Sequence, residues 1–151
     1  YVIGSAEAKV RVYDAEGQPV REISLDAASP VEYPGGLLVV DGNIWLSDTK
    51  SGRILGFDVE TGDAVSAWPE TYTVPRGMTL AGEGFAVADV LGQAAFVCDA
   101  EGAQTHVLDR ETVAELSFAL PEAVAWDAAK SRLYVSDSAG GNVVALNVRV
   151  K

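Results

Sequence analysis

The sequence contains almost none of the residues that catalysis and covalent cross-linking most often require. It has one cysteine, Cys98, and one histidine, His106, in 151 residues. A single cysteine excludes an internal disulfide and any cysteine-rich zinc site. The single histidine, the commonest general base at neutral pH, lies in a segment expected to be an outer strand and not at a candidate site, so we draw no catalytic triad. We therefore expect no catalytic residue, and interpret His106 as part of an outer strand and Cys98 as a small buried hydrophobe.

Positive charge and long apolar runs are also scarce. Eleven Lys and Arg residues face 22 Asp and Glu residues, which gives a formal net charge of −11. That charge repels phosphate backbones and anionic lipid surfaces, and no apolar run approaches the ~20 residues of a membrane-spanning helix. We expect an acidic protein with no nucleic-acid partner and no membrane insertion. Its 48% hydrophobic content is enough for a packed core.

The chain repeats itself at the period typical of propellers and solenoids, roughly 40 to 50 residues. The segment Pro34–Asp48 matches Pro75–Asp89 position for position, and Pro121–Asp137 is a third copy with two extra residues in its turn. Each copy continues through a Gly-containing link into two more short apolar segments, such as residues 51–58 and 59–65. Each repeat therefore contains four segments of strand length.

A four-stranded antiparallel unit of this size cannot bury both faces alone, so units stack face to face around an axis. The sequence predicts an all-β β-propeller with about three and a half four-stranded antiparallel blades in one segment spanning 1–151. Residues 110–120, with apolar side chains at helical spacing, remain a connector of undecided structure. An open arc exposes unpaired strand edges, so we expect the remaining blades to come from a longer chain or from other subunits. The blade parts are about 1–29, 30–73, 74–118 and 119–151.

The repeat resembles the NHL repeat. The shared pattern is Pro-x-Gly, an apolar strand, a turn, a strand ending like Tyr-Val-Ser-Asp, and then Asn or Arg and Phe-Asp. Its best copies are Pro34–Asp58 and Pro121–Asn147, while the opening repeat has Gly4 where the others have Asp. The resemblance implies a six-bladed propeller in a secreted, periplasmic or cell-surface protein. Related six-bladed propellers include the low-density-lipoprotein-receptor type and the amidating lyase, whose several zinc-binding histidines this chain lacks.

Three aspartates recur at one structural position, the end of the second strand of a blade: Asp48, Asp89 and Asp137. One interpretation is a ring of carboxylates for a hard cation such as Ca²⁺, which binds six to eight oxygens. The other, which we favour, is a turn-forming aspartate that accepts hydrogen bonds from backbone amides. A second set of acidic residues predicts hairpin turns between the third and fourth strands of a blade. Its members are Asp14 to Gly17, Asp58 to Asp63 and Asp99 to Gly102.

Loops on a rigid scaffold are where recognition normally occurs, so we expect a non-catalytic module that binds a protein or peptide partner. Arg76 and Glu122 follow the repeat prolines at equivalent positions and lie on the same rim. The alternative is a metal-dependent hydrolase like the senescence-marker-like lactonases, although their Glu-Gly-Pro strand opening is absent. We expect no cofactor, with Ca²⁺ as the ion to test, and interpret the three tryptophans as blade packing. The candidate ligand-binding residues are Asp48, Arg76, Asp89, Glu122 and Asp137.

Overall fold

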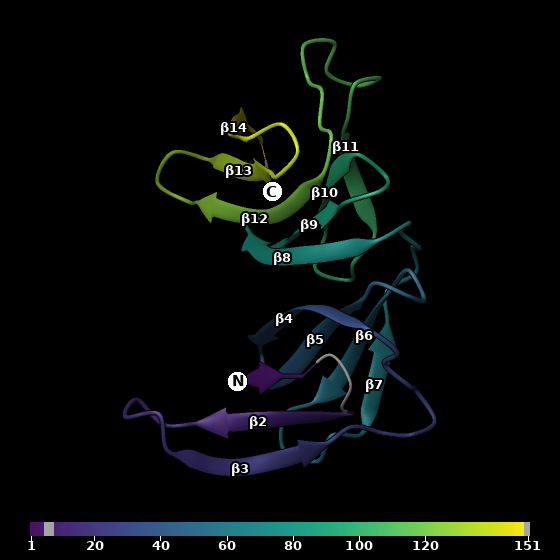
Figure 1. The fold of residues 1–151 in the computed structure, drawn as a ribbon, viewed down its shortest axis with the longest axis vertical. Coiled ribbons are helices and arrows are strands. Elements are labelled where there is room, and N and C mark those ends of the chain that lie inside the picture. Colours follow the sequence, from purple (N-terminus) through teal and green to yellow (C-terminus); the bar gives the residue numbers. More distant parts are fainter. Residues whose placement is uncertain (5–7, 150–151) are drawn as a thin grey trace.

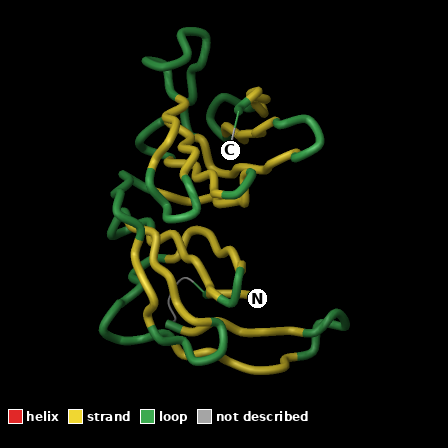
Figure 2. The backbone as a smooth tube through the Cα atoms, turned by 180° about the vertical axis from the view of Figure 1, so that it is seen from behind, coloured by secondary structure: helices red, strands yellow, loops and turns green. Residues whose placement is uncertain are grey.

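The computed structural model describes residues 1–4 and 8–149, which form fourteen strands in four antiparallel sheets and no helix (Figures 1 and 2). Within these residues no helix is long and apolar enough to cross a membrane. The first sheet contains β1 (Val2–Ile3), β2 (Lys9–Tyr13) and β3 (Pro19–Ser24), and the second contains β4 (Pro34–Val40), β5 (Asn43–Asp48), β6 (Arg53–Asp58) and β7 (Ala64–Ala67). The third contains β8 (Pro75–Ala81), β9 (Gly84–Asp89), β10 (Ala94–Cys98) and β11 (Gln104–Leu108), and the fourth contains β12 (Pro121–Asp127), β13 (Arg132–Asp137) and β14 (Asn142–Asn147). The prediction of an all-β arc of about three and a half blades is confirmed.

Strand register shows which part of a blade each terminal sheet contains. Ile3 of β1 pairs with Val10, as Ser47 of β5 pairs with Ile54. The strand β1 is therefore the second strand of its blade, and the described part of the first sheet comprises strands two to four. The fourth sheet comprises strands one to three, ordered β12-β13-β14.

The first strands of neighbouring blades, β4, β8 and β12, lie against one another at backbone distance. A Cβ at Gly36 would lie 2.2 Å from the carbonyl oxygen of Arg76, and one at Gly77 would lie 2.6 Å from Cα of Ala123. Ser47 strengthens this contact by donating its hydroxyl to the same Arg76 carbonyl at 2.8 Å. The glycine of the Pro-x-Gly motif is thus explained by close strand approach.

The core consists of three apolar clusters, one between each pair of successive sheets. In the middle cluster, Trp68 is 3% exposed and its ring centroid lies 4.8 Å from that of Phe85 and 5.7 Å from that of Trp45. Cys98, on β10 as expected, is 2% exposed, and burial raises the pKa of its thiol to about 11. The clusters centre on Val10, Ile44, Leu46 and Phe57; on Ile54, Trp68, Phe85 and Val87; and on Ala86, Val97, Leu133 and Val135.

The connector between β11 and β12 forms turns and no helix. Asp109 accepts hydrogen bonds from the amides of Glu111 and Thr112 at 3.0 and 2.9 Å. The connector therefore begins with a turn that the side chain of Asp109 caps. Apolar residues of the segment serve the core instead. Leu116, which belongs to the helical spacing, is 4% exposed, and Phe118, which does not, is 5% exposed. The segment therefore covers the interface between the third and fourth sheets.

Candidate functional site

Asp48 joins two connections at one end of the second sheet. Its Oδ1 accepts the amide of Tyr33 at 2.8 Å and its Oδ2 that of Glu32 at 3.2 Å, both in the segment entering β4. The amide of Lys50, just past Asp48, reaches Oδ1 at 3.3 Å. The carboxylate therefore ties the turn after β5 to the segment before β4.

The other two recurring aspartates repeat this geometry. Asp89 accepts the amides of Thr73 at 2.7 Å, Val74 at 2.8 Å and Gly92 at 3.0 Å. Asp137 accepts those of Ala119 and Leu120 at 2.8 Å and Gly140 at 3.1 Å. We call the end of the sheets that carries Asp48, Asp89 and Asp137 the aspartate end. The turn-forming interpretation of these residues accounts for every one of these contacts.

Burial and hydrogen bonding act in opposite directions on these carboxyl groups. Asp48 is fully buried and Asp137 is 2% exposed. For Asp48, burial disfavours the charged form, but hydrogen bonds from Ser51 and from the amides of Tyr33, Glu32 and Lys50 outweigh it and lower the pKa. Burial likewise opposes ionisation of Asp137, and the amides of residues 119, 120, 139 and 140 outweigh it and lower its pKa. Hydrogen bonds therefore favour the carboxylate form of both groups, from Ser51 and backbone amides at Asp48 and from backbone amides at Asp137.

Arg76 and Glu122 are brought together across two blades. Arg76 is the second residue of β8 and Glu122 the second of β12, and Nη1 of the arginine lies 3.4 Å from Oε1 of the glutamate. Their side chains are 41% and 39% exposed, so the pair contributes little to stability. It leaves one charge of each sign accessible at the aspartate end.

Further exposed side chains surround this pair, and sequence reasoning did not single them out. Tyr33 and Leu91 are 49% and 62% exposed at the aspartate end, in connections of the second and third sheets. Lys50 forms an exposed ion pair with Glu32. A sequence signal for two of them was available, because Lys50 and Leu91 each lie two residues after a recurring aspartate.

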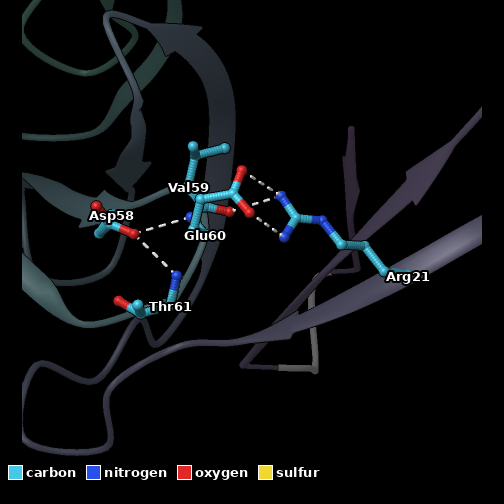
Figure 3. Close-up of polar contacts among 5 residues, drawn as sticks. All are labelled: Arg21, Asp58, Val59, Glu60 and Thr61. Atoms are coloured by element: carbon cyan, nitrogen blue, oxygen red, sulfur yellow. Dashed lines mark hydrogen bonds and ion pairs between the residues drawn. The ribbon is translucent and has the colours of Figure 1, made fainter.

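The second acidic set forms hairpin turns as predicted. Figure 3 shows the turn after β6, in which Oδ1 of Asp58 accepts the amides of Glu60 and Thr61 at 2.8 Å. Gly62 closes the turn with a φ of 81°, which disfavours any side chain. The same figure shows Arg21 of β3 donating to both carboxylate oxygens of Glu60 at 2.7 and 3.0 Å and to the Val59 carbonyl at 3.0 Å. This turn thus also joins the first sheet to the second.

The carboxylates do not converge on one point. No three His, Cys, Asp or Glu side chains in residues 1–4 and 8–149 are placed to hold a metal ion. Asp48, Asp89 and Asp137 each serve a separate blade, with their oxygens directed at backbone amides. His106 lies exposed on β11, where Nδ1 is 3.1 Å from the Thr105 hydroxyl.

Comparison with known proteins identifies the architecture. No protein-family model and no curated protein matches the chain. Among solved structures, it is similar to a streptogramin B lyase, with a TM-score of 0.70 and 15% identity over 92% of this chain and 44% of that one. The described residues form part of a β-propeller. A catalytically inactive virginiamycin B lyase from Staphylococcus aureus, solved with quinupristin, matches with a TM-score of 0.66 and 18% identity over 92% of this chain and 45% of its own.

The propeller segment is also similar to a protein that was designed computationally. The designed Ika4 protein matches with a TM-score of 0.66 and 12% identity over 95% of this chain and 82% of its own. Against the two lyases, by contrast, the segment spans less than half of the matched chain. At such low identities the similarity shows the fold alone.

Proposed function

We propose that this propeller segment is a non-catalytic binding module that recognises a protein or peptide through its aspartate end. The observation that carries the proposal is a contrast between repeated and variable positions. The aspartates repeat in three blades, whereas the exposed position two residues further on holds Lys50, Leu91 and Ala139 in turn. Positions fixed by folding recur, whereas exposed loop positions free of that constraint differ between blades and are available for recognition.

The chemistry of the exposed side chains at the aspartate end fits a polypeptide ligand. Tyr33 and Leu91 offer exposed apolar area, while Arg76 and Glu122 offer charges of both signs. Aromatic and arginine side chains are enriched at protein interfaces and at their energetic centres. A ligand with apolar anchors and a few charged groups matches this surface.

The lactonase-type alternative needs divalent-ion ligands near the same rim. The residues it would use are Glu122, Asp48, Asp89 and Asp137. The three aspartates accept backbone amides at 2.7–3.3 Å, and Glu122 lies 3.4 Å from Nη1 of Arg76. The amide hydrogen bonds already employ both oxygens of each aspartate carboxylate, and no three acidic, His or Cys side chains of residues 1–4 and 8–149 converge on one point, which favours the binding module. The finer assignment to NHL repeats, and to a secreted, periplasmic or cell-surface location, is part of the proposal and is supported by the repeat motifs alone.

The experiment is selection of peptides from a displayed random library on the 151-residue chain, followed by affinity measurement on variants. We expect the selected peptides to bind Leu91→Ala and Arg76→Ala at least about tenfold more weakly, which is the effect of losing one interface anchor. Val20→Ala, an equally exposed residue on β3, is the matched control and keeps full affinity. Peptides that bind all three variants equally, or divalent-dependent opening of a lactone by the chain, would contradict the proposal.

A further inference from the structure

A cavity of about 420 Å³ lies between the connection from β3 to β4 and the outer strands of the second sheet (Figure 1). Its lining combines small side chains of the connection with residues of β6 and β7, among them Ala28, Ser29, Pro30, Arg53, Leu55 and Ser66. The second sheet has all four strands, and the connection is described without a gap. The cavity is therefore bounded on both sides by residues of this chain.

Bulky side chains fill the equivalent places at the next two connections. Each connection can be aligned by the amide that Oδ1 of a recurring aspartate accepts, which belongs to Tyr33, Val74 or Leu120. Two residues before that amide, the connection to the third sheet has Tyr72, which is 7% exposed and whose ring centroid lies 5.2 Å from that of Phe96. The connection to the fourth sheet has Phe118 at this position and Leu116 two residues earlier, both buried.

The connection to the second sheet has smaller side chains at these positions. Val31 stands in place of the aromatic residue, and Ser29 stands in place of the leucine. Leu55, which is in register with Phe96, lines the cavity. The cavity therefore results from a difference in sequence between the connections, while the strands beneath them keep the same arrangement.

Arg53 brings an uncompensated positive charge to this cavity. The residues in register with it in the third and fourth sheets are Ala94 and Asn142, so the charge is specific to the second sheet. The Arg53 side chain is exposed and has no hydrogen-bond or ion-pair partner among residues 1–4 and 8–149. Glu32, the acidic residue in the lining, is already paired with Lys50. A negatively charged group of a ligand would therefore find an available partner here.

The lining is suited to a carboxylate on a short apolar stem. A guanidinium group binds both oxygens of a carboxylate through two parallel hydrogen bonds. The hydroxyl groups of Ser29 and Ser66 are further donors, and Leu55 and Pro30 offer apolar contact for methylene groups. Aspartate and glutamate side chains have this combination of a carboxylate and a short apolar stem.

We propose that the cavity binds the carboxylate of an aspartate or glutamate side chain in the peptide ligand. This inference rests on the proposed function and adds one required chemical feature to the ligand. Ser51, three residues after Asp48, lines the cavity, and so does Glu32, which precedes Tyr33. The cavity thus adjoins the recognition surface at the aspartate end, and a peptide held there by its acidic residue extends toward Tyr33.

The first test is a double-mutant cycle with peptides selected from the displayed random library on the 151-residue chain. We expect each peptide to contain an aspartate or glutamate whose replacement by the amide weakens binding at least about tenfold. Arg53→Gln should weaken the unchanged peptide to the same extent, and the amide replacement should then have no further effect. Arg110→Gln, at an exposed position before β12, is the matched control and keeps full affinity.

A second variant tests the cavity without changing a charge. Ser29→Leu introduces the residue type found at the equivalent position of the next connection but one, and we expect it to weaken peptide binding about tenfold by filling the space. Ser117→Leu, at an exposed position of that other connection, is the matched control and leaves binding unchanged. Urea unfolding of both variants checks that they fold.

A third measurement uses a probe that does not depend on selection. We expect N-acetyl-glutamate methylamide to cause saturable changes in the amide chemical shifts of residues 51–55 and 64–67, and its glutamine counterpart to cause none. The same changes should be absent in Arg53→Gln. Equal shifts with both compounds, or shifts that persist in Arg53→Gln, would overturn the proposal.

The outcomes for this cavity and for the proposed function can be told apart. Peptides that depend on Leu91 and Arg76 but bind Arg53→Gln and Ser29→Leu with full affinity would overturn the cavity proposal and leave the proposed function standing. Peptides that depend on Arg53 but not on Leu91 or Arg76 would support the cavity and contradict the proposed function. Acidic peptides that lose affinity with Arg110→Gln in place of Arg53→Gln would also overturn the cavity proposal.

Discussion

Replacement of Asp89 by alanine tests whether the recurring aspartates hold the blades together. Asp89 is 2% exposed and accepts three backbone amides, from Thr73, Val74 and Gly92, at 2.7–3.0 Å. The alanine variant leaves those donors without their charged acceptor. At about 1 to 1.5 kcal/mol of net stabilisation for each of the three hydrogen bonds, the free energy of unfolding should fall by roughly 3 to 4.5 kcal/mol.

That loss is large compared with the roughly 5 to 15 kcal/mol that stabilises a typical domain. With a urea dependence of about 2 kcal/mol per molar, the midpoint of unfolding should fall by roughly 2 M. Tryptophan fluorescence reports the transition, because Trp68 is buried against Trp45 and Phe85 between the second and third sheets. Asp89→Asn keeps one acceptor oxygen and should lose about half as much free energy.

The control is Asp63→Ala, which removes the same charge from an exposed position in the hairpin turn after β6. It should change stability by less than about 0.5 kcal/mol. A free energy of unfolding for Asp89→Ala within about 1 kcal/mol of the unchanged chain would refute the argument.

Three further predictions concern packing, pH and reactivity. Gly36→Ala places a Cβ 2.2 Å from the carbonyl oxygen of Arg76. The free energy of unfolding measured in urea should therefore fall by about 2 kcal/mol or more. An unchanged urea midpoint would contradict the close contact between β4 and β8. The pKa values of the Asp48 and Asp137 carboxyl groups are lower in the folded than in the unfolded chain. The stabilisation that they provide is therefore complete above about pH 4 and is lost as the pH falls through their folded pKa values. Urea midpoints that stay constant from pH 5 to pH 3 would show that folding does not lower these pKa values. Cys98, buried and with a pKa raised to about 11, should react with iodoacetamide at pH 8 only after unfolding; rapid alkylation of the native chain, detected by mass spectrometry, would place it at the surface.

Much of the fold was predictable because its repeat constrains the same positions in successive blades. Gly36 and Gly77 recur where first strands meet backbone to backbone, and Asp48 and Asp89 recur where a turn must be tied. These contacts lie within one blade or between a blade and its neighbour, so the same residue types recur in each copy of the motif. The register of the terminal sheets followed from the same motif, down to Gly4 in place of an aspartate.

The details that depend on contacts distant in sequence were not predictable. Two of the amides bound by Asp137 belong to residues 17 and 18 positions upstream, in the segment that leads to Pro121. Arg21 donates a hydrogen bond to Glu60 in the next sheet, 39 residues away, and no sequence motif predicts this contact. The apolar spacing of residues 110–120 suggested helix equally well, and only the packing of Leu116 against the third and fourth sheets decides otherwise.

The most direct test of this account is a calorimetric titration of the 151-residue chain with Ca²⁺. Asp48, Asp89 and Asp137 each use their oxygens to bind backbone amides of their own blade. We therefore predict no stoichiometric heat of Ca²⁺ binding up to millimolar concentration, and the same trace for Asp48→Asn. One-to-one binding that is lost in both Asp48→Asn and Asp137→Asn would contradict the account and show that the recurring aspartates form a cation site.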